Sequence, residues 1–335
     1  MTHEIPLPER MFQMITGFWV TQALGTFAEL GFADQLAHGA QTAGALAAKA
    51  GTDPDATYRL LRGLASVGVL VKDHTRFQLT PLGATLRIDS PNSMRDMART
   101  MAMEPHWLPW GHLLEAVRTG SRQTGATLGT ELFAYYDTHP DVREAFFGAM
   151  HGLSMLVARE APKVYDASAH RELCDVGGSG GTIAAGFLNA NPQLTATVFD
   201  RPEVVPMATQ AIRDAGLSER CRAIGGDFFI DVPEADLYVV KHILHDWSDE
   251  QCRTLLGNIA RRAKVGARVL VIEMVVPDDS SPSAAPLMDL NMLVLLPGRE
   301  RTAGQYGELF SSAGLRLIDV RPTHSPMQVV VAEKV

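Results

Sequence analysis

The sequence predicts an α/β fold, with a mainly parallel sheet that ends in an antiparallel hairpin, preceded by an all-α, winged-helix-like N-terminal domain. From about residue 171 onward, short β-branched runs alternate with segments of helical periodicity, which is typical of a parallel sheet with helices on both faces. The last two runs, 315–321 and 327–333, are joined by too few residues for a crossover, so they must pair antiparallel. Residues 42–80 have the order helix, turn, helix and hairpin.

The composition limits the functional classes. The chain has 335 residues, of which 46% are apolar, and its net charge of −8 gives no overall attraction to nucleic acid or to anionic membranes. It has no apolar run of about eighteen residues and no signal-peptide pattern at its N-terminus, so we expect no membrane span and a cytoplasmic location. Its three cysteines are far apart and match no metal-ligand spacing, which predicts free thiols and no metal site.

Residues 11–38 predict one or two strongly apolar helices. Large side chains such as Met11, Phe18 and Trp19 fall on more than one helix face, so these faces must be buried. We interpret the segment as a subunit interface, which predicts a homodimer. An ordinary core helix would give the same pattern.

The next segment predicts a winged helix. A short helix after Thr42 is stopped by Gly51, and Asp53-Pro54 starts a second helix with an apolar face. Runs at 69–71 and 77–79 then bracket a polar turn. Winged helices often bind DNA, but residues 1–90 hold seven Lys or Arg against eight Asp or Glu and lack the basic surface that phosphate contact needs. A structural or dimerising role and no nucleic-acid partner are therefore expected.

Residues 93–165 look helical and are rich in Met, Trp, Phe and His, which suits either a pocket for a flat ligand or a core. The expected domains are 1–95 for dimerisation, 96–165 for a helical acceptor-pocket region and 166–335 for the catalytic sheet. Strands are expected at 172–176, 194–199, 221–224, 236–243 and 267–275. Helices are expected at 181–189, 203–215, 249–264 and 301–313. A surface loop is expected at 277–286.

A glycine-rich turn follows the first strand, in Asp175-Val-Gly177-Gly178-Ser179-Gly180-Gly181. Glycines let a ligand approach the backbone and leave the amides of the next helix free. The turn lacks the glycine spacing of the dinucleotide fingerprint, which counts against NAD and FAD.

Carboxylates close the next two strands. Asp200 ends the second strand, about 20 residues beyond the glycines, where an acid can bind ribose hydroxyls. Gly226-Asp227-Phe228 follows the third strand, so that Asp227 could accept from an adenine amino group while Phe228 packs on the ring. The alternative is a tight turn with two capping aspartates.

His245 lies in Ile243-Leu-His-Asp-Trp247, at the expected end of the fourth strand, where ligands bind in open α/β sheets. An imidazole at this edge can move a proton near neutral pH. Glu273 ends the neighbouring strand and Glu300 comes from a later loop, and a carboxylate there would fix the tautomer of the ring. Alternatively, His245 is a solvent-facing loop histidine beside unrelated acids.

Together these residues resemble the class I S-adenosylmethionine-dependent O-methyltransferases. The subfamily includes plant caffeate and flavonoid enzymes, hydroxyindole O-methyltransferase and bacterial enzymes that tailor natural products. The resemblance covers nearly the whole chain. It rests on the glycine turn, Gly226-Asp227-Phe228-Phe229, Lys241, Leu244-His245-Asp246-Trp247 and Gly298-Arg-Glu300-Arg-Thr302.

The resemblance implies a homodimer that uses S-adenosylmethionine to methylate a phenolic hydroxyl of a small aromatic natural product. His245 would be the general base, oriented by Glu273 and Glu300. The cofactor would be bound by Asp175, Gly177, Gly178, Asp200, Gly226, Asp227, Phe228 and Lys241. The acceptor would be bound by Trp107, Phe146, Met150, Asp246, Asn291 and Leu295. A phenol has a pKa near 10, so a base that removes its proton would speed the reaction by about 10² to 10⁴.

The chain departs from the family at two positions. Ser179 stands where a third glycine is usual, and Asn291 stands where plant members often have Met. Some relatives have lost methyl transfer and catalyse hydroxylation or decarboxylation. The first alternative function is therefore hydroxylation or decarboxylation with the same cofactor. The second alternative is a winged-helix regulator.

Overall fold

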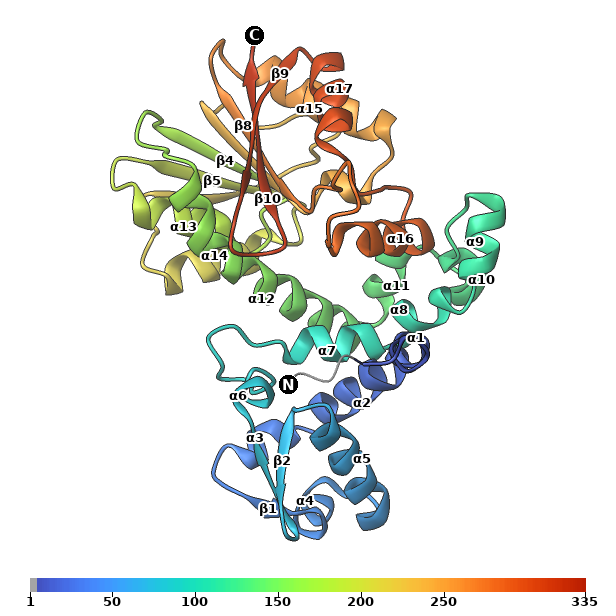
Figure 1. Ribbon diagram of the computed structural model, residues 1–335. Helices are drawn as coiled ribbons and strands as arrows, with labels where there is room; N and C mark the ends of the chain where they lie inside the picture. Colours follow the sequence, from blue (N-terminus) through green and yellow to red (C-terminus); the bar gives the residue numbers. More distant parts are fainter. Residues whose placement is uncertain (1–4) are drawn as a thin grey trace. The chain divides into compact units, whose positions relative to one another are not determined.

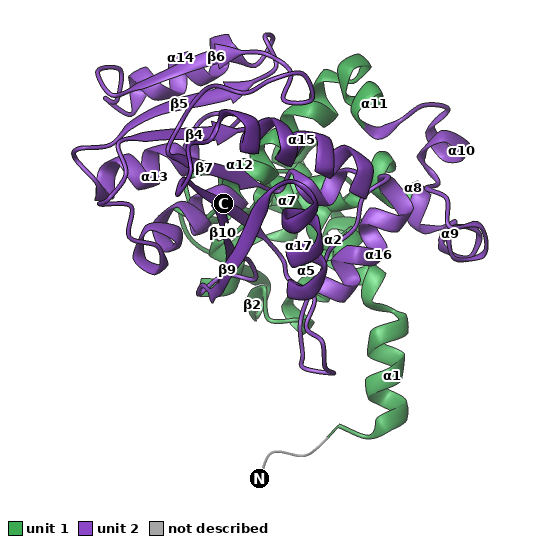
Figure 2. Cartoon of the chain, turned by 90° about the horizontal axis from the view of Figure 1, so that it is seen from above, with its two compact units in different colours: residues 1–108, 133–152 green, residues 109–132, 153–335 purple. Residues whose placement is uncertain are grey.

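The computed structural model describes residues 5–335, and the chain forms two compact units, coloured separately in Figure 2. Unit 1 contains the residues up to 108 together with 133–152, and unit 2 contains 109–132 and 153–335. The long helix α12 (Pro140–Val164) contributes residues to both units. The domain boundaries expected after residues 95 and 165 stay predictions.

Unit 1 contains the predicted winged helix. Thr42 and Asp53 cap the helices that follow them, because their side chains accept the backbone N–H groups of Ala45 and Ala56. The predicted hairpin forms, and a short additional strand completes an antiparallel sheet of order β1-β3-β2. The elements are α1 (Leu7–Ile15), α2 (Gly17–Glu29), α3 (Phe32–Leu36), β1 (Gln41–Thr42), α4 (Ala43–Ala50), α5 (Pro54–Ser66), β2 (Leu70–Asp73), β3 (Arg76–Leu79) and α6 (Pro81–Ala84).

The region between the winged helix and the large sheet is helical, as predicted, and is rich in aromatic residues. Its helices are divided between the two units. In unit 1, His106, Tyr136 and Phe146 stack on one another, and the His106 Nε2 lies 2.8 Å from the Tyr136 hydroxyl. The helices of this region are α7 (Arg95–Ala102), α8 (Glu104–Trp110), α9 (Leu113–Thr119), α10 (Thr124–Leu128), α11 (Leu132–Thr138) and α12.

Unit 2 is built on a seven-stranded sheet of order β6-β5-β4-β7-β8-β10-β9. Figure 1 labels β4, β5, β8, β9 and β10 of this sheet. All pairs are parallel except those of β10, which runs antiparallel to β8 and β9, so the predicted terminal hairpin is confirmed. The predicted strands and helices agree with the structure to within two residues at each end. The elements are β4 (Glu172–Val176), α13 (Thr182–Ala190), β5 (Thr195–Asp200), α14 (Val205–Asp214), β6 (Cys221–Gly225), β7 (Leu237–Lys241), η1 (Leu244–Asp246), α15 (Asp249–Arg262), β8 (Arg268–Glu273), α17 (Ala303–Ser312), β9 (Leu315–Pro322) and β10 (Gln328–Lys334).

The two faces of the sheet carry separate cores. Leu173 of β4 belongs to the core that α13, α14 and the second half of α12 cover, whereas its neighbour Cys174 belongs to the core that α15 and α17 cover. Because successive strand residues point to opposite faces, the continuous apolar strands predicted from the sequence are what a sheet buried on both sides requires. This packing fixes the carboxyl ends of the strands, where the candidate site lies.

Two α-helices of the described chain were not predicted, the short α6 in unit 1 and α16 in unit 2. Helix α16 (Ala285–Leu295) follows the expected surface loop, which extends to Ala284. Its apolar run has no clear periodicity, and Pro286 at its start was the available signal, because proline is favoured in the first turn of a helix.

Disulfides, metal sites and membrane-spanning helices were not expected from the sequence, and the structure describes residues 5–335. All three cysteines are buried and unlinked by disulfides. Within this part of the chain, no cluster of His, Cys, Asp or Glu has the arrangement of a metal site. No helix in the same range is both long and apolar enough to cross a bilayer.

Candidate active site

The glycine turn after β4 contains left-handed backbone conformations that glycine adopts readily. Gly177 and Gly181 have φ angles of 70° and 73°, which are strained for residues with a Cβ. A Cβ on Gly177 would also lie 2.5 Å from the Ile243 side chain. Ser179, which replaces the usual glycine, adopts a left-handed φ of 49° and is exposed.

Two aspartates support this turn from different sides. Asp175 is buried and accepts the Ala184 N–H at 3.1 Å, so it holds the start of α13, and burial raises its pKa to about 7. Asp200 accepts the backbone N–H of Ser179 at 2.8 Å and that of Arg201 at 2.7 Å. Burial raises the pKa of Asp200. The Ser179 amide, rather than its hydroxyl, is therefore the group that meets Asp200.

The other predicted cofactor residues follow β6 and end β7. Asp227 accepts the Phe229 N–H at 2.8 Å, and Phe228 packs edge-on against Phe229 and, at 6.2 Å between centroids, against Trp247. Lys241 donates to the Ser154 hydroxyl at 2.8 Å, and burial lowers its pKa to about 8. Gly226 lies against the Phe199 ring, which a Cβ would contact at 2.5 Å.

These residues fit S-adenosylmethionine. Asp200 and Gly225 are paired neighbours on parallel strands, so Asp200 and the Gly226-Asp227 segment lie at the same sheet edge as the glycine turn. The set offers carboxylate acceptors for hydroxyl and amino groups and a turn with free space beside Gly180, where a Cβ would meet only Ala211 at 3.9 Å. That chemistry matches a ribose, an adenine and a cationic sulfonium.

His245 lies on the short 3₁₀ turn η1, directly after β7, as predicted. The link from β7 to η1 starts with His242, whose φ of 51° lies in the left-handed region that residues other than glycine rarely adopt. The turn ends at the capping box of α15, in which Ser248 and Gln251 bond reciprocally. The loop of Gly298 packs directly on it, since a Cβ there would lie 1.9 Å from the His245 carbonyl oxygen.

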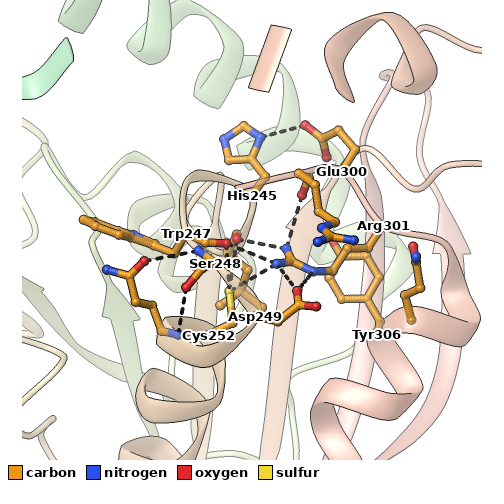
Figure 3. Close-up of polar contacts among 12 residues, drawn as sticks. His245, Trp247, Ser248, Asp249, Cys252, Glu300, Arg301 and Tyr306 are labelled. Carbon is orange, nitrogen blue, oxygen red and sulfur yellow. Dashed lines mark hydrogen bonds and ion pairs between the residues drawn. The ribbon is translucent and has the colours of Figure 1, made fainter. Parts of the chain in front are cut away.

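The His245 ring is buried between two carboxylates. Its Nδ1 lies 2.7 Å from Glu300 Oε1 (Figure 3). Its Nε2 lies 3.3 Å from Asp246 Oδ1. Burial lowers the pKa of His245, but the charges of Asp246 and Glu300 outweigh this effect and raise the pKa to about 9. Asp246 itself has a pKa raised to about 6 by burial. At neutral pH the ring is therefore mainly an imidazolium.

Glu273 does not orient the ring in the predicted way. Its Oε1 accepts the backbone N–H groups of Ile243 and His245, each at 3.1 Å, and its Oε2 accepts the Tyr306 hydroxyl. The carboxylate is fully buried, and burial raises its pKa. Glu273 thus holds the backbone of the turn, while Glu300 is the glutamate that contacts the imidazole. The neighbouring-strand argument placed Glu273 near His245 but could not give the direction of its side chain.

The predicted acceptor residues fall in different units. In unit 2, Asp246 lies beside His245, Asn291 accepts a hydrogen bond from the Trp110 indole at 2.8 Å, and Leu295 of α16 is buried. In unit 1, Phe146 stacks on Tyr136 at 4.7 Å and Trp107 lies 5.7 Å from Phe18. Met150, also predicted, is partly buried on α12.

Three residues near His245 were missed by sequence reasoning. The His242 ring stacks on the His245 ring, with centroids 4.7 Å apart, and its buried Nε2 has no protein partner in the described chain. Burial, Lys241 and His245 keep its pKa well below the ordinary value. Tyr306 binds Glu273, and Arg301 is buried beneath the turn. Arg301 could have been identified from the sequence, because this charged residue lies inside the segment from Gly298 to Thr302 that carries the family resemblance.

The chain matches two family models. Residues 110–316 match an O-methyltransferase domain, and residues 12–88 match an O-methyltransferase dimerisation domain. The chain is 36% identical to the phenazine O-methyltransferase of Lysobacter antibioticus, over 99% of this chain and 97% of that protein. It is 35% identical to the mitomycin biosynthesis 6-O-methyltransferase of Streptomyces lavendulae, over 92% and 89%. It is 34% identical to the acetylserotonin O-methyltransferase of Bos taurus, over 95% of each.

Solved structures agree with this relationship. A human N-acetylserotonin methyltransferase in complex with S-adenosylmethionine has a TM-score of 0.91 at 33% identity, covering 100% of this chain and 99% of that chain. A mitomycin 7-O-methyltransferase has a TM-score of 0.89 at 34% identity, covering 98% of each. The chain therefore belongs to the S-adenosylmethionine-dependent O-methyltransferases that carry this dimerisation domain, the family of the bacterial natural-product and acetylserotonin enzymes.

Proposed function

We propose that this O-methyltransferase uses His245 as the general base that deprotonates a ring hydroxyl of a small bacterial natural product. The contact between His245 Nδ1 and Glu300 Oε1, 2.7 Å long and buried, carries this proposal. The names of its relatives specify phenazine, mitomycin and 3-amino-4-hydroxybenzoate as compounds on which they act or which they help to make. A flat aromatic acceptor is the class that these compounds suggest.

The cofactor is assigned to the sheet edge after β4, β5 and β6. We assign the turn of Gly177 and Gly178, supported by Asp175, to the amino-acid end, Asp200 to the ribose, and Asp227 with Phe228 to the adenine. Lys241 and Gly226 shape the surrounding wall. When bound, S-adenosylmethionine supplies an electrophilic methyl group.

His245 acts on the acceptor through Nε2. Since Glu300 accepts the Nδ1 proton, Nε2 is the nitrogen left to take the proton of the hydroxyl. Asp246 lies beside Nε2 in the structure, so an acceptor hydroxyl that reaches Nε2 takes the place of this carboxylate. Loss of that contact lowers the pKa of His245 from about 9, because Asp246 is the charge that raises it most. The acceptor thereby helps to generate the neutral base that it needs.

The test replaces His245 with Gln, with His324→Gln as the matched control, because the His324 side chain is 95% exposed. We expect His245→Gln to lower kcat on a phenolic acceptor by about 10² to 10⁴-fold, the usual size of base catalysis. Its affinity for S-adenosylmethionine by calorimetry should change less than about threefold. If His245→Gln keeps its turnover while His324→Gln is normal, the proposal that His245 is the general base is wrong. Product analysis by mass spectrometry would also reveal hydroxylation or decarboxylation in place of methylation.

We further propose that the chain is a homodimer. The dimerisation domain supports this proposal, and so do exposed large apolar side chains on α1 and α2, namely Met11, Phe12, Met14, Ile15, Phe18 and Trp19. The remaining acceptor residues, Trp107, Phe146, Met150, Asn291 and Leu295, stay predictions for substrate binding. A cytoplasmic location and the lack of a nucleic-acid partner also stay predictions.

A further inference from the structure

Arg301 is the most completely bonded charge in the described part of unit 2 that the proposed mechanism does not use. Its side chain is 1% exposed. Its Nε and Nη2 donate to Asp249 Oδ1 at 3.2 and 2.8 Å. Its Nη1 donates to the carbonyl oxygens of Leu244 and Arg299 at 2.9 and 3.2 Å, and its Nη2 also donates to that of Trp247 at 3.1 Å. These contacts occupy all five N–H donors of a guanidinium.

The partners of Arg301 bracket the catalytic turn. Leu244 directly precedes His245, and Trp247 ends the same turn, so one guanidinium binds the backbone on both sides of the base (Figure 3). Asp249 is the first residue of α15. Glu273 holds the N–H of His245 from below the turn, and the Cys252 thiol lies 3.2 Å from the Leu244 carbonyl oxygen. The peptide that precedes His245 and the carbonyl group of Trp247 are therefore held by the side chains of Glu273, Arg301 and Cys252.

The same segment also carries the residue that contacts the ring. Glu300, which binds Nδ1, directly precedes Arg301 in the chain. The segment is anchored on its other side, since the Glu300 N–H donates to Asp289 at 2.9 Å and the Arg301 carbonyl oxygen accepts from Val276 at 3.0 Å. The backbone of the base and the carboxylate on its ring are thus tied to one dipeptide.

We propose that Arg301 is a positioning residue, which sets the separation of Glu300 from the His245 ring and thereby the basicity of the base. This inference rests on the proposed role of His245. A planar five-donor fork is needed, because the ammonium of lysine has three donors at a single point and cannot reach carbonyl groups on both sides of the turn. The contact of 2.7 Å between Nδ1 and Glu300 is then a consequence of the Arg301 network.

The experiment compares Arg301→Lys, Glu300→Gln and the double variant. Arg262→Lys is the matched control, because Arg262 makes a surface ion pair with Asp231 in the same unit. We expect Arg301→Lys to lower kcat about 10- to 100-fold, the effect of misplacing a catalytic group by about 1 Å. The KM for S-adenosylmethionine should stay within about twofold. In the free protein, the pKa of His245 measured by NMR titration of labelled histidine should fall, since the ring loses part of its contact with Glu300.

The double variant distinguishes positioning from general destabilisation. If Arg301 acts through Glu300 and His245, adding Arg301→Lys to Glu300→Gln lowers kcat by less than about threefold more. An unchanged pKa of His245 in Arg301→Lys, or losses in kcat that multiply fully in the double variant, would overturn the inference. If Arg301→Lys does not fold, Asp249→Asn loosens the same guanidinium from its more exposed side and is measured in the same way. The proposed function has a separate failure, which is turnover by His245→Gln.

Discussion

Two neighbouring strands of the same sheet end in turns that are built differently. The turn after β4 and the turn after β7 each contain a left-handed residue other than glycine, Ser179 and His242. The first turn is partly exposed, leaves space beside Gly180 and is fixed mainly by Asp175 and Asp200. The second turn is buried, and Glu273, Glu300 and Arg301 hold its backbone and its ring.

This difference matches the two tasks proposed for the turns. A turn that receives a cofactor must keep backbone groups and space available until the ligand arrives. A turn that carries a base must hold one ring in one orientation before the reaction, because reorganisation during the reaction would cost rate. The same strand-end topology therefore supports an open site and a preorganised one.

Among the groups that support the two turns, the largest effect is expected from Glu300→Gln, which removes the carboxylate charge beside the His245 ring. We expect kcat to fall about 10²-fold or more, within the range of general base catalysis. The pKa of His245 should fall as well, because Glu300 is one of the charges that raise it to about 9. Since the neutral ring is the active form, the rise of kcat/KM with pH should move to lower pH. If the rise of kcat/KM with pH stays at the same pH in Glu300→Gln, Glu300 does not set the pKa of His245.

The second prediction concerns stability against pH. The folded pKa of His245, about 9, lies above the ordinary value of 6.5, so protonation favours the folded state. This contribution, on the order of 3 kcal/mol, is complete below pH 6.5 and is lost as the pH rises through about 9. Urea unfolding at pH 6 and pH 9.5 should show a stability difference between wild type and His245→Gln that shrinks at the higher pH. A difference independent of pH would contradict the raised pKa.

The third prediction compares two glycines of the open turn. Gly177→Ala places a Cβ against Ile243 at a left-handed φ, so we expect a loss of about 1–3 kcal/mol of stability. Gly180→Ala meets only Ala211 at 3.9 Å and should leave stability nearly unchanged. If the cofactor uses the space beside Gly180, this second variant should still weaken S-adenosylmethionine binding by calorimetry. If Gly180→Ala binds S-adenosylmethionine with full affinity, the cofactor does not use the space beside Gly180.

The smallest effect is expected from Ser179→Gly, which restores the usual glycine. Glycine adopts the left-handed φ without strain but gives the unfolded chain more freedom, so the two terms nearly cancel and stability should change by less than about 1 kcal/mol. Since Asp200 binds the backbone amide of residue 179, cofactor affinity should also be kept. A large loss of affinity would instead assign the serine hydroxyl to cofactor binding.

The extent of sequence-based prediction differs between these two turns. The alternation of strands and helices, the glycine turn and the positions of Asp200 and His245 follow from periodicity and from residues at strand ends, which are local properties. Helix α16 was missed because its apolar run lacks a helical period. For Glu273, the sequence indicated the neighbouring strand, but the carboxylate binds the backbone of the turn instead of the ring.

The sequence by itself determined most of the elements of the sheet domain, their order in the chain and the family, because each depends on patterns within a few residues or on motifs. Only the tertiary structure decided that Glu300 and not Glu273 contacts the ring, that Asp246 lies at Nε2 and that Arg301 binds both sides of the turn. These contacts join residues up to 57 positions apart, and they depend on side-chain directions that packing selects. The chemistry of His245 is set by those directions, because the charges around a buried imidazole fix its pKa.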